Sequence, residues 1–163
     1  TYVACELRPE EHRALSKVLA GRPGVKTACV DGYERAVADL PAKGPALVLI
    51  DPPFERSDDY DLCARALGRL LRRNRDAWVM IWLPIKDLET FDAFLRAAED
   101  EAREALTVAE ARMRPLSDPM KMNGCALVLA RCPADLSPVL EAVCNWTVTA
   151  LGQEGRASVW TTG

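Results

Sequence analysis

The chain has 163 residues, of which 49% are hydrophobic and 28% are charged, and its formal net charge is −3. This length suits one domain with a proper core, which excludes disordered, collagen-like and disulfide-scaffold proteins. The longest apolar runs, such as Ala46–Ile50 and Ala77–Leu83, are far shorter than the roughly 20 residues of a membrane span, so we expect no membrane partner. The small acidic excess argues against nucleic-acid binding over the whole surface but allows a local basic patch.

Cysteine and histidine usage restricts the chemistry. The six cysteines form no C-x-x-C pair, and His12 is the one histidine. A zinc site would lack ligands, and a Ser-His-Asp or Cys-His hydrolase would have to use His12, which lies in a charged helical stretch. We therefore predict no metal site, and reduced cysteines in a cytoplasmic protein.

Strand-like and helical segments alternate along the chain. Pro9 favours a helix start and Gly21 a helix end, while apolar residues recur on one face of each helical stretch. In chain order, we expect a strand at Tyr2–Cys5, a helix at Glu10–Ala20, a strand at Val25–Val30, a helix at Tyr33–Leu40, a strand at Ala46–Ile50, a helix at Asp59–Asn74, a strand at Ala77–Leu83, a helix at Asp87–Ala105, a strand at Leu106–Met113, a loop at Arg114–Asn123, a strand at Cys125–Arg131, a helix at Leu136–Leu151 and a strand at Ala157–Thr161.

This alternation predicts an α/β fold. Strands that alternate with helices of this length form βαβ units, with a mostly parallel sheet and helices on both of its faces. The nearly continuous apolar runs Ala46–Ile50 and Ala77–Leu83 fit strands that are covered on both faces. We expect one domain over residues 1–163.

Acidic residues follow three of the expected strands: Glu6, Asp31 with Gly32, and Asp51 with the residues after it. Ligands of open α/β sheets bind beyond the carboxyl ends of the strands, where a carboxylate can accept both hydroxyls of a ribose. An acceptor beside a glycine lets the backbone approach an adenine edge. For Glu6 and Asp31, capping of the next helix is an equal alternative.

The segment Asp51-Pro52-Pro53-Phe54 is more specific. Two prolines remove two N–H donors, so the carboxylate and a proline carbonyl form a paired acceptor for an exocyclic NH2 group. The aromatic ring that follows can stack on the base that carries this amine. The alternative is that the prolines only end a buried strand and that Phe54 packs in the core.

The Asp51–Phe54 segment and further segments along the whole chain resemble those of a known protein family. Asp-Pro-Pro-Phe resembles motif IV of the S-adenosylmethionine-dependent amino-methyltransferases, and the chain as a whole resembles the RlmJ family of 23S ribosomal RNA adenine-N6 methyltransferases, which have a Rossmann-like class I fold. The segments that carry the resemblance are Glu6–His12, Asp31–Tyr33, Leu49–Glu55, Asp59-Tyr60, Trp82–Ile85, Met122–Gly124 with Cys125–Leu129, and Ala157–Trp160.

The resemblance implies roles for particular residues. Glu6 matches the residue that holds the ribose of S-adenosyl-L-methionine, and Asp31 with Gly32 matches the pair at its adenine. Asp51 matches the catalytic carboxylate beside the cofactor, within a catalytic segment that runs through Pro52 and Pro53 to Phe54. Two positions depart from the family: Phe54 is often Tyr, and Arg8 is often His. The implied partner is 23S ribosomal RNA, bound by a monomer without a metal.

The resemblance also implies a part that the sequence does not contain. It starts at what would be the second strand of the fold, so we expect the first strand and a basic N-terminal segment to precede Thr1. Arg69, Arg72, Arg73 and Arg75 cluster at the end of the helix after the Asp51 segment. A helix runs away from the active edge, so we expect this cluster to complement the helix dipole and the N-terminal part to bind RNA phosphates.

Two alternative functions remain open. A guanine-N2 methyltransferase of ribosomal RNA also uses Asp-Pro-Pro-Phe, although the Glu6–Pro9 and Trp82–Ile85 stretches disfavour it. A non-catalytic RNA-binding or interaction module on the same fold would explain an absent first strand and is disfavoured by the intact Asp51–Phe54 segment.

Overall fold

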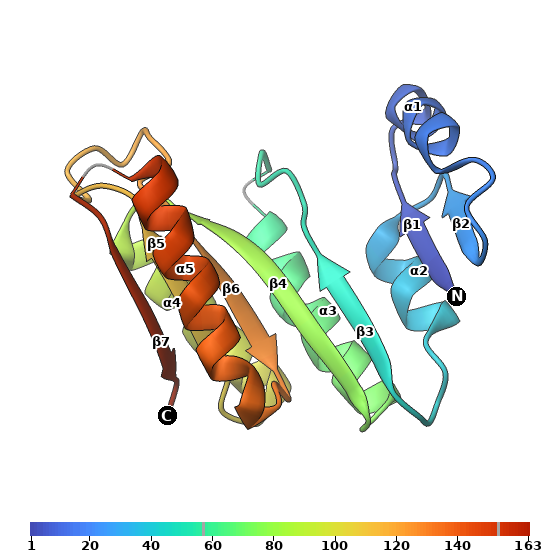
Figure 1. Ribbon diagram of the computed structural model, residues 1–163. Helices are drawn as coiled ribbons and strands as arrows, with labels where there is room; N and C mark the ends of the chain where they lie inside the picture. Colours follow the sequence, from blue (N-terminus) through green and yellow to red (C-terminus); the bar gives the residue numbers. More distant parts are fainter. Residues whose placement is uncertain (57, 153) are drawn as a thin grey trace. The chain divides into compact units, whose positions relative to one another are not determined.

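A computed structural model describes residues 1–56, 58–152 and 154–163, and the chain divides into two compact units, Thr1–Leu40 and Pro41–Gly163 (Figure 1). Each unit has its own sheet, of two strands in the first unit and five in the second. The expectation of one domain over residues 1–163 stays a prediction.

The first unit consists of two short parallel strands, each followed by a helix. β1 (Tyr2–Cys5) pairs with β2 (Val25–Ala28) over their whole length. α1 (Pro9–Leu19) starts with proline and has two acidic residues in its first turn, where the helix dipole favours them. α2 (Gly32–Asp39) follows β2. The type and order of these elements match the sequence prediction.

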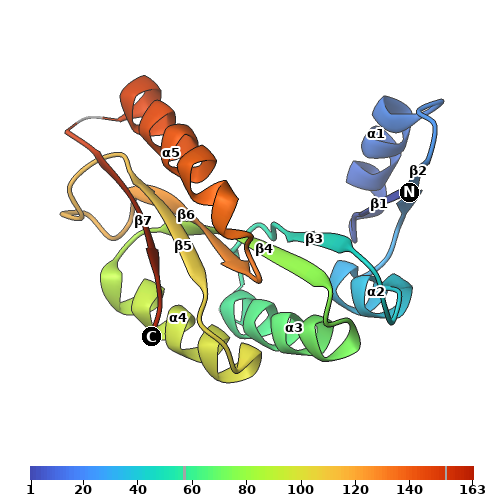
Figure 2. The ribbon, with the colours of Figure 1, turned by 60° about the horizontal axis from the view of Figure 1, so that its bottom comes forward.

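The second unit is a five-stranded sheet with helices on both faces. α3 and α4 cover one face, and α5 lies on the other, as Figure 2 shows. The strand order is β3-β4-β6-β5-β7. The elements are β3 (Ala46–Ile50), α3 (Asp59–Arg73), β4 (Ala77–Ile85), α4 (Leu88–Ala102), β5 (Thr107–Arg112), β6 (Gly124–Ala130), the short 3-10 helix η1 (Ala134–Leu136), α5 (Ser137–Leu151) and β7 (Arg156–Thr161).

The core of this unit includes the layer between α3 and the sheet. Leu67 and Leu70 of α3 are at most 1% exposed, and Val79 and Ile81 of β4 are fully buried. Burial of each such side chain contributes about 1.5–3 kcal/mol to stability. On the other face, α5 packs its Leu140 into a second cluster with strand residues of β5 and β6.

The pairing of the strands differs from the mostly parallel sheet that we predicted. β1–β2 and β3–β4 are parallel, but the pairs β4–β6, β5–β6 and β5–β7 are antiparallel. The physical reason lies in the connection between β5 and β6, which is a loop without a crossover helix, so β6 returns beside β5 in the opposite direction. β3, β4 and β5 still run in one direction.

The covering of β3 also differs from the prediction. Leu47 and Leu49 are 62% and 58% exposed, whereas Ile50 is 7% exposed. Alternate residues of a strand point to opposite faces, and α3 covers one face only within the described part of the second unit. The strand is therefore buried on one face rather than on both.

Candidate active site

The turn after β3 offers hydrogen-bond acceptors to solvent. β3 pairs with β4 as far as Ile50, opposite Ile81, and Asp51 follows at the carboxyl end. The Asp51 side chain is exposed and makes no hydrogen bond or ion pair with any residue that the structure describes. Pro52 and Pro53 have no N–H to donate. An unpaired carboxylate beside proline carbonyls is suited to a group with more than one N–H donor.

Phe54 closes this turn with a buried ring. Its φ of 50° lies in the left-handed region, which is uncommon for a residue other than glycine. The ring is 8% exposed, with its centroid 4.9 Å from that of Tyr60 and 6.3 Å from that of Trp82. Tyr60 lies in turn 6.1 Å from Phe94 of α4. Phe54 thus anchors the turn to α3 and β4, which is the core-packing alternative, and its stacking on a base stays a prediction.

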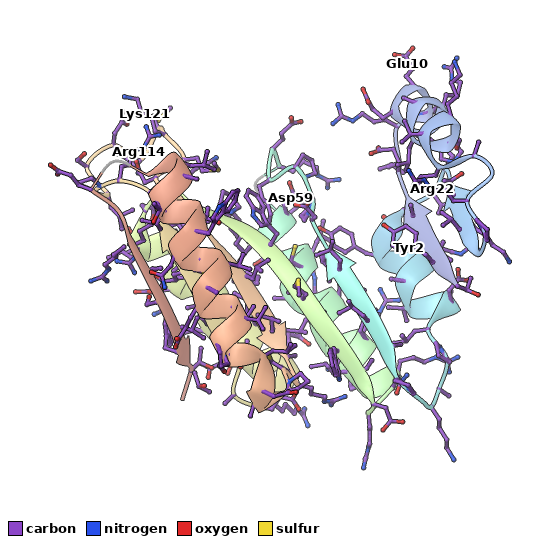
Figure 3. The ribbon with its side chains drawn as sticks, viewed as in Figure 1. Tyr2, Glu10, Arg22, Asp59, Arg114 and Lys121 are labelled. Carbon is purple, nitrogen blue, oxygen red and sulfur yellow. The ribbon has the colours of Figure 1, made fainter. Side chains whose placement is uncertain are left out.

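The start of α3 is fixed by two carboxylates near the turn, Asp58 and Asp59, of which Figure 3 labels Asp59. The guanidinium of Arg56 donates to both carboxylate oxygens of Asp58, over 2.9 and 2.7 Å, and this bond holds the pKa of Asp58 below its usual range. The backbone N–H of Arg56 donates to Oδ2 of Asp59 over 3.0 Å, and Asp59 is only 4% exposed. These contacts connect the turn to the helix.

Glu6 and Asp31 lie at one edge of the first unit, because β1 and β2 are parallel and each residue follows its strand. The N–H of Glu6 donates to the carbonyl of Ala28 over 3.1 Å, and its Oε1 accepts from the N–H of Arg8 over 2.8 Å. The half-buried Glu6 carboxylate therefore lies on the loop that leads into α1, and it caps no helix through its side chain.

Asp31 is the N-cap of α2. Its Oδ1 accepts from the N–H groups of Tyr33 and Glu34, over 2.8 and 3.3 Å. A Cβ at Gly32 would lie 3.4 Å from Cβ of Cys5, so the start of α2 lies beside the end of β1. The capping alternative thus holds for Asp31, and its cofactor role, like those of Glu6 and Gly32, stays a prediction. Glu6, Asp31 and Gly32 share one edge, and the Asp51–Phe54 turn belongs to the other unit.

Asn123 links two loops at the carboxyl edge of the second unit, a role that the sequence pattern did not reveal. Its Nδ2 donates to the carbonyls of Lys86 and Asp118, both over 2.8 Å, and its backbone N–H donates to the carbonyl of Ile85 over 2.8 Å. The residue is 1% exposed. The one sequence signal was its place in the Met122–Gly124 segment, for which we predicted no role.

The described residues contain no group of three or more His, Cys, Asp or Glu side chains that could hold a metal ion. All six cysteines are free thiols. Burial raises the pKa of four of them, Cys5, Cys125, Cys132 and Cys144. None of the helices in the described part of the chain is long and apolar enough to cross a membrane.

A solved structure has the same fold. The crystal structure of a protein from Legionella pneumophila matches with a TM-score of 0.81 and 24% identity, over 99% of this chain and 60% of that one. Together with the helices on both faces of the five-stranded sheet, this likeness shows that the two proteins share a mixed α/β fold, the arrangement that we expected for a class I methyltransferase.

Sequence comparison then identifies the family. The family model for "Ribosomal RNA large subunit methyltransferase D, RlmJ" matches residues 1–162, so the chain belongs to the RlmJ family of ribosomal RNA methyltransferases. It is 29% identical over 157 residues to the ribosomal RNA large subunit methyltransferase J of Haemophilus influenzae, and 22% identical over 151 residues to that of Escherichia coli. These matches cover 96% and 92% of this chain and 56% and 54% of the relatives, so the chain spans about half of their length.

Proposed function

We propose that the protein methylates the exocyclic N6 amine of an adenine in 23S ribosomal RNA, with S-adenosyl-L-methionine as the methyl donor. The family membership supports ribosomal RNA as the substrate. The single observation that carries the choice of an amine is the exposed carboxylate of Asp51, which has no partner among the described residues and is followed by two prolines without N–H donors. We assign the protein to the cytoplasm and expect it to act as a monomer.

The catalytic turn acts through acceptors. The lone pair of an adenine amine is delocalised into the ring, which makes the amine a poor nucleophile. Asp51 and a proline carbonyl of the turn accept its two N–H bonds, so that the lone pair is available to an electrophile and Asp51 can take the proton. Phe54 keeps the turn in this shape through its contacts with Tyr60 and Trp82. The rate enhancement that the turn supplies arises mainly from positioning of the amine.

The first unit supplies the residues that would hold the cofactor. Bound S-adenosyl-L-methionine would supply an activated methyl group on its sulfonium, so the chemistry needs no metal. Glu6 is the acceptor proposed for the ribose hydroxyls, and Asp31 with Gly32 the pair proposed at the adenine. Asp31 can take this role while it caps α2, because both cap hydrogen bonds go to its Oδ1.

Two other functions fit the same observations less well. Methylation of guanine at N2 would also suit an acceptor-only turn, and the identity of the methylated base separates the two reactions. A non-catalytic RNA-binding module would not need an unpaired carboxylate at Asp51. Calorimetric titration of the purified protein with S-adenosyl-L-methionine tests this option: heat of binding supports the enzyme, and a folded protein without any heat supports the module.

A further inference from the structure

Three basic residues are close together at the carboxyl edge of the second unit, around Asn123. Lys86 follows β4, and its carbonyl accepts from Nδ2 of Asn123. Arg114 follows β5 closely, and its backbone N–H donates to the carbonyl of Asn123 over 3.1 Å. Lys121 lies two residues before Asn123 on the same loop, where its N–H donates to the carbonyl of Asp118. We call Lys86, Arg114 and Lys121 the basic rim.

The basic rim lies on the edge of the sheet that carries Asp51. β3, β4 and β5 run in one direction, so the turn after β3 and the loops after β4 and β5 leave the sheet on the same side. Figure 3 shows Arg114 and Lys121 at the same end of this unit as Asp59, which begins α3 after the Asp51–Phe54 turn.

Two of the three charges have no counter-ion among the described residues. Neither Lys86 nor Arg114 has a carboxylate within ion-pair distance there, and Nε of Arg114 is buried without a hydrogen-bond partner. Lys121 forms an exposed ion pair of 3.3 Å with Asp118. The nearby Asp87 is occupied as the N-cap of α4, where it accepts from the N–H and hydroxyl of Thr90. Lys86 and Arg114 are thus the two positive charges of the rim that have no ion-pair partner in the described part of the chain.

The arginine cluster that the sequence showed lies at the opposite edge. Asn74, which ends α3, donates to the carbonyl of Gly44 just before β3 begins, so the last turn of α3 lies at the amino end of the strands. Arg72 is bonded there to Glu101 over 3.4 Å. This agrees with the expected distance of the cluster from the active edge, and it leaves Arg75 as a matched basic residue far from the rim.

We propose that the basic rim binds phosphates of the RNA substrate next to the base that enters the Asp51 turn. Lys86 and Arg114 form no ion pair with any described residue, so their charged groups can donate charge-assisted hydrogen bonds to phosphate oxygens. Asn123 positions the rim, because it connects the backbones of Lys86 and Arg114. The proposal rests on the proposed function for the identity of the RNA, and it adds a second RNA-binding surface to the N-terminal segment that we expected to bind phosphates.

The test is the salt dependence of binding to transcribed 23S ribosomal RNA, with the full protein. Each phosphate contact contributes about 0.7–0.9 to the slope of log affinity against log salt. The double variant Lys86→Gln/Arg114→Gln should therefore lower the magnitude of the slope by roughly 1.4–1.8. Arg114→Lys keeps the charge and should keep most of the slope, and the control Arg75→Gln should leave it unchanged.

An unchanged slope in the double variant would overturn the proposal. If circular dichroism shows that Arg114→Gln does not fold, the single variant Lys86→Gln decides, because the Lys86 side chain is exposed. The salt slope of this variant should fall in magnitude by about 0.7–0.9, and a wild-type slope would contradict the proposal. Methylated nucleosides are measured separately. Loss of slope in the variants together with absent methylation in the wild type would retain the rim and refute the proposed reaction.

Discussion

The ring of Phe54 lies 4.9 Å from that of Tyr60, at an interplanar angle of 43°. This contact joins the turn that carries Asp51 to the first turn of α3. The contact also offsets the cost of the left-handed backbone conformation at Phe54, which is of order 1–2 kcal/mol. The shape of the acceptor turn therefore depends on a buried aromatic contact.

Phe54→Ala should destabilise the protein by about 3 kcal/mol or slightly more, because a buried ring is replaced by a cavity. Urea unfolding monitored by circular dichroism measures this loss. Phe54→Tyr retains the ring and is the matched control. A loss below about 1 kcal/mol for Phe54→Ala would mean that the ring does not anchor the turn.

Asp31→Ala and Glu6→Ala should separate capping from cofactor binding. Asp31→Ala removes the N-cap of α2 and should cost about 1 kcal/mol of stability without cofactor. Glu6→Ala should leave stability nearly unchanged and weaken S-adenosyl-L-methionine binding by about 1.5–3 kcal/mol. Thermal unfolding and calorimetric titration of both variants give the four values. If Glu6→Ala lowers the melting temperature and keeps the affinity, its role is structural.

Asn123→Ala should destabilise the second unit by about 1–3 kcal/mol, because the partly buried carbonyls of Lys86 and Asp118 lose their donor. The basic rim would then lose its position, so KM for RNA should rise more than kcat falls. Asn123→Asp is the informative companion, since it keeps the volume and removes the donor. Wild-type KM for RNA in both variants would show that Asn123 does not position the rim.

The Arg56–Asp58 bond should be visible in the titration of Asp58. Its pKa is below the usual range because Arg56 donates to the ionised carboxylate, so Arg56→Ala should raise this pKa. The Arg56–Asp58 bond stabilises the folded protein when the pH is above the pKa that Asp58 has in the unfolded chain. This stabilisation is lost as the pH falls through the pKa of Asp58 in the folded chain. Carboxyl NMR shifts measured against pH follow the group directly. An unshifted titration in Arg56→Ala would mean that the bond does not persist in solution.

The sequence predicted the elements because each has a local signature. The apolar stripe of α3 recurs at helical spacing, and Pro9 and Gly21 mark the ends of α1. The same holds for the acceptor turn, since Asp51, Pro52 and Pro53 are adjacent in the chain. The chemistry that we propose for this turn rests on residue types that need no tertiary contact.

Other features depend on contacts between distant residues and left no local signature. The place of β6 between β4 and β5 depends on strand pairing across the sheet, which the apolar pattern does not encode. The burial of Phe54 depends on Tyr60 and Trp82, and a stacking ring has the same sequence as a packed one. Asn123 joins carbonyls that are 37 and 5 residues away, so its importance becomes apparent only in the folded chain.

The most direct test of the account is the identity of the modified nucleoside. 23S ribosomal RNA incubated with the full protein and S-adenosyl-L-methionine is digested and analysed by mass spectrometry, with Asp51→Ala beside the wild type. We predict N6-methyladenosine with the wild type and none with Asp51→Ala, while the variant still binds the cofactor, because the acceptor is needed most in the transition state. A methylguanosine product, or near-native turnover in Asp51→Ala, would contradict the account.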